Sequence, residues 1–298
     1  MDEQKRESVY IAGSGRINGG VYDVIKIMGS ARISGDVEAN TIRTAGSSSF
    51  SGNVKALQVK TAGSCRVSHD LDADALQTAG TCVVEGDVRA TRFSCSGSQR
   101  VGGDVVAGEI KISGSLVVGS DVEADSFYSK GRFEVGGLLS ADDIQIGLGH
   151  RGTSRAGEVG GERIEVRRAG QSWSLHKQDF ERQVGKVGYK LEKGFAKLRD
   201  RFGIEIEIGD LDKLVEEMVK FGDKIKAHID IDLGEFNEAG KLEAETIEGD
   251  EVYLENTKAG TVRGKTVTIG PGCQVERVEY SLSLEVDERA HVGQREKC

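Results

Sequence analysis

A column of acidic residues is the first feature of this sequence that could do chemistry. Its members recur at intervals of 17 or 34 residues, at Asp36, Asp70, Asp87, Asp104 and Asp121. Carboxylate oxygens are ligands for divalent cations, so such an edge could bind a metal. Carboxylates about 5 Å apart repel by only about 1 kcal/mol in water, and a glycine followed by Asp or Asn is typical of turns. We therefore expect solvated turn residues, with no metal and no cofactor.

The histidines and cysteines do not form a recognisable site either. The five histidines lack ligand-like spacing, and the sequence contains no P-loop, GxGxxG, GxSxG or HExxH motif. Cys65 and Cys82 lie one repeat apart, at a separation that permits a disulfide, but buried cysteines more often pack as small hydrophobes. We predict no catalytic residue and expect that the chain is not an enzyme.

These residues belong to a repeat. Glycine recurs every 17 residues from Gly29 to Gly131, and an earlier unit near Gly13 is one residue shorter. Counting each unit from its glycine, the fifth residue is apolar: Ile33, Phe50, Val67, Val84, Val101, Val118 and Val135. The eleventh residue is always alanine: Ala39, Ala56, Ala73, Ala90, Ala107, Ala124 and Ala141.

The spacing inside each unit indicates strands. Apolar positions fall in pairs two residues apart, at the third and fifth, ninth and eleventh, and fourteenth and sixteenth residues, which is the strand period. Each strand would pair in parallel with its equivalent one turn along. The sequence therefore predicts an all-β fold with a small α-helical insert, in which residues 9–147 form a parallel β-helix of 17-residue turns.

The repeated Gly-Asp-Val-x-Ala steps resemble the bactofilins, which are bacterial polymer-forming cytoskeletal proteins. The steps are clearest at Gly35-Asp36-Val37-Glu38-Ala39 and Gly86-Asp87-Val88-Arg89-Ala90. The resemblance covers about residues 9–147 and, more loosely, residues 242–286. It implies a right-handed β-helix that assembles end to end into nucleotide-independent, non-polar filaments. It further implies a membrane-associated scaffold for cell shape or envelope organisation.

A different pattern interrupts the repeat. We predict a glycine-rich loop and a short strand over 148–170, followed by a helical insert over 171–232. The first helix would carry an apolar face of Phe180, Val184, Val187, Leu191, Phe195, Leu198 and Phe202. Its basic face would include Lys186, Lys190, Lys193 and Lys197. Such a helix either packs in a hairpin on itself or the rod, or lies on an anionic membrane surface.

Strand-like alternation resumes in an irregular segment over 233–286, which would either extend the first rod or pack beside it. Residues 1–8 and 287–298 are predicted to be polar tails. The net charge of −9 argues against nucleic acid as a partner. With five cysteines, no apolar leader and no long apolar stretch, we expect a cytoplasmic protein, peripheral to the membrane if its insert binds lipid.

Three classes of function fit these features. The first is a scaffold that self-assembles through the ends of its β-helix. The second is a non-polymerising adaptor that binds partner proteins, with the helical insert as a docking or membrane-surface element. The third is a carbohydrate-binding or cell-wall module, against which the single tryptophan argues.

Overall fold

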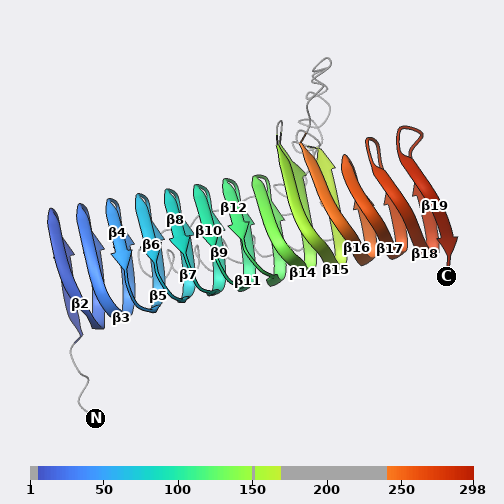
Figure 1. Cartoon of the computed structure of the whole chain (residues 1–298). Coiled ribbons are helices and arrows are strands. Elements are labelled where there is room, and N and C mark those ends of the chain that lie inside the picture. The colour runs from blue at the N-terminus through green and yellow to red at the C-terminus, as the bar shows by residue number, and fades with distance from the viewer. Residues whose placement is uncertain (1–5, 150–151, 169–239) are drawn as a thin grey trace, which may run out of the picture. The chain divides into compact units, whose positions relative to one another are not determined.

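The computed structural model describes residues 6–149, 152–168 and 240–298, which form one stack of parallel strands (Figure 1). All regular secondary structure in these residues is β-strand, in a single 19-stranded sheet. These strands belong to one compact unit. The predicted helical insert over 171–232 lies outside the described residues.

The strands follow the chain in order. Their bounds are β1 (Glu7–Ile11), β2 (Ser14–Ile27), β3 (Ser30–Thr44), β4 (Ser47–Phe50), β5 (Val54–Thr61), β6 (Ser64–Val67), β7 (Leu71–Thr78), β8 (Thr81–Val84), β9 (Val88–Cys95), β10 (Ser98–Val101), β11 (Val105–Ile112), β12 (Ser115–Val118), β13 (Val122–Ser129), β14 (Arg132–Leu148), β15 (Thr153–Arg168), β16 (Lys241–Leu254), β17 (Thr257–Ile269), β18 (Gln274–Val286) and β19 (His291–Lys297).

Each strand pairs in parallel with its counterpart one turn along. In the regular part, Val54 pairs with Leu71 and Leu71 pairs with Val88, which is the 17-residue register. The register omits the twelfth position of these turns, as at Leu57, and the twelfth and thirteenth side chains both point away from the core. This interruption divides the long strand into two sides, and the short strand supplies a third. The predicted parallel β-helix is confirmed.

The core is a set of stacked columns. At the fifth position, every side chain from Ile33 to Val135 is at most 2% exposed. In the alanine column, Ala90 and Ala124 are partly buried and the other five are buried. Phe127 and Phe133 pack edge to face with ring centroids 5.2 Å apart. Columns of similar residues bury apolar surface continuously along the stack, so neighbouring turns stabilise each other.

The glycine that begins each turn is required by backbone stacking. A Cβ on Gly80 would lie 2.0 Å from the carbonyl oxygen of Gly63, and one on Gly97 would lie 1.9 Å from that of Gly80. Real Cβ atoms do not approach an oxygen this closely, so any side chain here would force the turns apart.

The β-helix does not end at residue 147. Strand β14 continues to Leu148, and the predicted glycine-rich loop is mostly strand β15, in which Ser140 pairs with Gly160. A Cβ on Gly161 would lie 2.2 Å from the carbonyl oxygen of Ala141. These glycines permit close packing of strands instead of forming a loop, which is why composition alone was misleading.

The C-terminal strands extend the same stack. Strand β15 pairs with β16 across the intervening residues, as at Ile164 with Val252, and β17 and β18 follow. The predicted polar tail over 287–298 contains a strand, because β19 pairs with β18 from His291 to Lys297. At the other end, β1 begins at Glu7, inside the predicted N-terminal tail.

Candidate functional site at the root of the insertion

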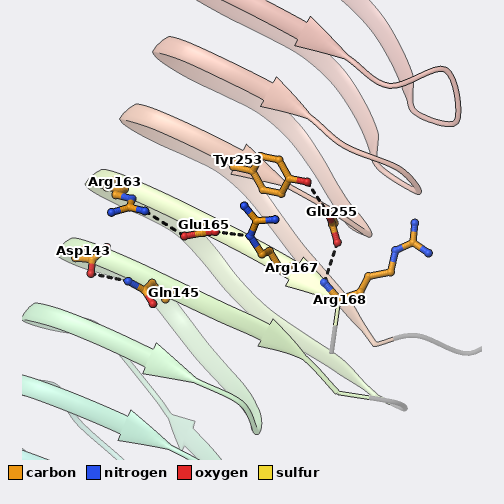
Figure 2. Close-up of polar contacts among 8 residues, drawn as sticks. All are labelled: Asp143, Gln145, Arg163, Glu165, Arg167, Arg168, Tyr253 and Glu255. Atoms are coloured by element: carbon orange, nitrogen blue, oxygen red, sulfur yellow. Dashed lines mark hydrogen bonds and ion pairs between the residues drawn. The ribbon is translucent and has the colours of Figure 1, made fainter. Parts of the chain in front are cut away.

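A cluster of charged side chains marks the place where residues 169–239 depart from the β-helix. Figure 2 shows it on β14, β15 and β16, around the end of β15 at Arg168. Its members are Asp143, Gln145, Arg163, Glu165, Arg167, Arg168, Tyr253 and Glu255. They come together because β14, β15 and β16 are consecutive turns, which align Gln145, Glu165 and Tyr253 in one outward column.

Glu165 is held between two arginines of its own strand. Its residue exposure is only 4%, although its column faces outward. Arg163 Nη2 donates to Glu165 Oε2 at 3.3 Å, and Arg167 Nε donates to Oε1 (Figure 2). The guanidinium of Arg167 also lies 4.2 Å from the ring centroid of Tyr253, a cation–π contact. A buried carboxylate with paired guanidinium donors is satisfied electrostatically, and breaking such a pair is costly.

Glu255 joins the two limbs of the chain that flank the insertion. It is 1% exposed. Tyr253 Oη donates to Glu255 Oε1 at 2.7 Å, and the backbone N–H of Arg168 donates to Oε2 at 2.9 Å. The backbone N–H of Glu255 itself donates to the carbonyl of Val166 at 2.9 Å. The carboxylate thus ties the last residue of β15 to the turn that follows β16.

Tyr253 remains neutral over the physiological range. Burial, and then the hydrogen bond and negative charge of Glu255, raise the pKa of Tyr253 to about 12. The neutral phenol is the form that can donate to the carboxylate.

The carboxylate of Glu255 in this cluster binds a backbone N–H group, at Arg168. The cluster contains no Cys, Ser or His nucleophile beside a base. Among residues 6–149, 152–168 and 240–298, no group of three or more His, Cys, Asp or Glu side chains could hold a metal ion. The arrangement can fix the end of β15, where the insertion begins, against the turn that follows β16.

The predicted acidic column is a hydrogen-bonded ladder. The Oδ1 atom of each Asp or Asn accepts the backbone N–H of the equivalent residue one turn along. The bond is 2.9 Å from Asp87 N to Asp70 Oδ1 and 3.0 Å from Asp104 N to Asp87 Oδ1. The ladder runs from Asp36 through Asn53 to Asp121, which accepts from Leu138 N at 2.8 Å. These carboxylates complete turns, as the turn interpretation expects.

Steric crowding between turns explains most of the glycines that precede the acids. A preference for positive φ applies to Gly35, at +93°, but not to Gly52, Gly86 or Gly103. Instead, a Cβ on Gly86 would lie 2.2 Å from Asp70 Oδ1, and one on Gly103 would lie 2.1 Å from Asp87 Oδ1. The side chain of one turn occupies the space that a Cβ of the next turn would need.

Cys65 and Cys82 are adjacent in the register and buried, and both are free thiols. The hydrogen bond with Cys65 and burial raise the pKa of Cys82, so this thiol stays protonated. Burial also raises the pKa of Cys95. The three pack as core residues.

The residues of the predicted basic helix, from Phe180 to Phe202, lie outside the described residues. Within the part of the chain that the structure describes, there is no helix long and apolar enough to cross a membrane.

Reasoning from sequence did not find Glu165 and Glu255. The short strand predicted within residues 148–170 does lie in β15, and the outward charges at Arg163, Glu165 and Arg167 were a usable signal. Glu255 could not be linked to them, because the insertion separates the two carboxylates in the sequence.

Comparisons with known proteins give two partial matches. Over 58 residues the chain is 52% identical to a protein of Bacillus subtilis (strain 168) titled "Uncharacterized protein YhbF". Over 51 residues it is 59% identical to "Uncharacterized protein YhbE" of the same strain. The matches cover 20% and 17% of this chain, and the chain spans only 25% and 22% of these relatives. No family model matches the chain, and no solved structure matches it.

Proposed function

We propose that the chain is a structural scaffold that assembles through the ends of its β-helix into polymers, without nucleotide. The parallel β-solenoid suits such a role, and it fits the bactofilin-like fold that the Gly-Asp-Val-x-Ala steps resemble. The assembly would organise shape or envelope in a bacterial cytoplasm. The chain itself would be its main partner and would catalyse no reaction.

The observation that carries this proposal is the state of the two ends. Among the described strands, β1 pairs only with β2, and β19 pairs only with β18. Each end therefore presents a strand edge with free backbone donors and acceptors. Another copy of the chain is a natural partner for such an edge.

The core is also less covered at the ends than in the middle. Ile11 and Ile17 at one end, and Val286 and Val292 at the other, are only partly buried. The positions in the middle that are equivalent to Ile17 and Val292, such as Val84 and Val118, are at most 1% exposed. Tyr10, at 68% exposure, adds apolar surface at the first strand. Docking of another end would bury these side chains, which favours association.

Negative-stain electron microscopy and sedimentation velocity of the full chain, without nucleotide and over a range of salt, test the proposal. We expect filaments or sheets. Ile11→Asp and Val292→Asp would place a carboxylate in an end contact and should abolish them. Leu57→Asp is the matched control, because Leu57 is an exposed apolar side chain, at 56%, in the middle of the stack.

A monodisperse monomer or dimer under all conditions would contradict the scaffold proposal. An adaptor that binds partner proteins would then be the better account, with residues 171–232 as the first place to search for a docking or membrane-binding element.

A further inference from the structure

Charge is segregated around the N-terminal half of the β-helix. From Ser14 to Val118, the outward second, fourth, fifteenth and seventeenth positions of each turn contain no Asp or Glu. The acids of these turns lie on the remaining positions, as at Asp36, Asp72 and Glu85. Although the net charge of the chain is −9, every outward side chain on this edge is thus either basic or uncharged.

Most of the basic side chains of this edge are available to a ligand. Arg66 pairs with Glu85 at 3.0 Å. Lys111 pairs with Glu109 at 2.6 Å. Among the described residues, no ion pair within 4.0 Å involves the remaining six. They are Arg16, Lys26, Arg32, Arg43, Lys60 and Arg100. Stacking repeats them along the edge at intervals of about 4.8 Å or multiples of it. A row of unpaired cations creates a positive potential that attracts and orients an anionic partner.

A groove of about 660 Å³ follows this edge over the fifteenth to seventeenth positions. Lys26, Arg43 and Lys60 line it, together with the exposed methyl groups of Ala45, Ala62 and Ala79. The alanines are short and the basic side chains long, so the methyl groups form an apolar floor beside a cationic rim. Met28, at 61% exposure, extends the apolar surface at one end.

We propose that this groove binds an acidic amphipathic helix of a partner protein. An apolar stripe at helical spacing would pack on the alanine column, and flanking Asp or Glu side chains would meet the basic rim. The groove runs from the turn of Lys26 to that of Lys111, five turns away, or about 24 Å. A helix of about 16 residues has this length.

The groove lies along the side of the β-helix, so assembly through the ends leaves it open. The inference therefore does not depend on polymer formation. An anionic ligand without apolar groups would contact the basic rim but not the alanine methyl groups. A bilayer surface would contact the row of basic side chains without filling the groove.

Fluorescence anisotropy with the full chain tests the inference. The probe is a labelled 18-residue peptide with leucines at i, i+3, i+4 and i+7 spacing and glutamates elsewhere. We expect saturable binding that weakens as salt rises. The double substitution Arg43→Glu with Lys60→Glu should weaken it by about tenfold or more. The control Lys55→Glu with Arg89→Glu changes charge equally on the tenth position and should stay within about twofold.

Two further probes separate the alternatives. A scrambled peptide of the same composition should bind more weakly than the amphipathic one. Any co-sedimentation of the chain with vesicles that contain phosphatidylglycerol should be the same for the wild type and the groove variant. Three results would each overturn the proposal. The amphipathic peptide could bind the groove variant as tightly as the wild type, or the scrambled peptide could bind as tightly as the amphipathic one. Vesicles could also bind the wild type but not the groove variant.

Discussion

At the scale of single residues, glycine and aspartate act as a pair across neighbouring turns. The Oδ1 atom of one turn occupies the place of a Cβ in the next and accepts the following backbone N–H. Gly52, Gly86 and Gly103 each precede a residue whose backbone N–H donates to an Oδ1 atom of the previous turn. The distances from N to Oδ1 at these three places are 2.7, 2.9 and 3.0 Å. Where His69 or Ser120 takes that place, they are 3.2 and 3.1 Å. The two longest distances of the ladder occur where a side chain stands at this position.

A double-mutant cycle tests this pairing. Gly103→Ala alone should destabilise the chain by about 1–3 kcal/mol, because its Cβ would lie 2.1 Å from Asp87 Oδ1. Asp87→Ala alone should cost about 1 kcal/mol through loss of the hydrogen bond to Asp104 N. In the double variant, the alanine at 103 has room, so the combined cost should fall below the sum. Urea denaturation measures all three, and strict additivity would contradict the steric explanation.

The phenol of Tyr253 gives a pH-dependent prediction. Its pKa is raised to about 12 in the folded chain, above the value of about 10 for an unfolded tyrosine. The folded state thus keeps this proton to higher pH. The associated stability is fully present below about pH 10 and is lost as pH rises toward 12.

Absorbance at 295 nm reports tyrosine ionisation. We expect the difference between wild type and Tyr253→Phe to show one group titrating near pH 12, among six tyrosines in all. Titration of that group near pH 10 in the folded chain would show that the phenol is neither buried nor bonded to Glu255.

At the scale of elements, the charged cluster explains how β15 and β16 remain neighbours although residues 169–239 lie between them in the sequence. Glu165 fixes two arginines of β15, and Glu255 binds the backbone at Arg168. The end of β15 is thereby held against the turn that follows β16, and the register Ile164 to Val252 is kept.

Glu165→Ala should destabilise the chain by about 1–3 kcal/mol, because it leaves two partly buried guanidinium groups without their carboxylate. Amide hydrogen exchange should quicken most in β15 and β16. Glu158→Ala on the same strand is the control, because Glu158 is exposed and should change stability by less than about 0.5 kcal/mol. Equal effects of the two substitutions would contradict the role assigned to the cluster.

The same elements show what the sequence can and cannot predict. The 17-residue turns were readable because one column, such as Ile33 to Val135, repeats without a break. The later turns were not, because the offset changes to 15 residues between Leu242 and Thr257. Strand β19 was missed because its side chains are mostly exposed and polar, which removes the alternation that marks a strand. The cluster depends on contacts across the insertion, which no local pattern contains.

At the scale of the molecule, the described strands form one continuous stack from β1 to β19, with an open edge and a partly covered core at each end (Figure 1). The basic edge lies along the side of this stack, and the insertion begins after β15. Association through the ends and binding of partners along the side would therefore use different surfaces of the described strands.

X-ray fibre diffraction from aligned polymers tests the central claim most directly, because strands in this stack repeat about every 4.8 Å along its axis. End-to-end assembly predicts a strong reflection near 4.8 Å parallel to the filament axis. A 4.8 Å reflection perpendicular to the filament axis, or a chain that forms no polymers to align, would contradict assembly through the ends of the β-helix.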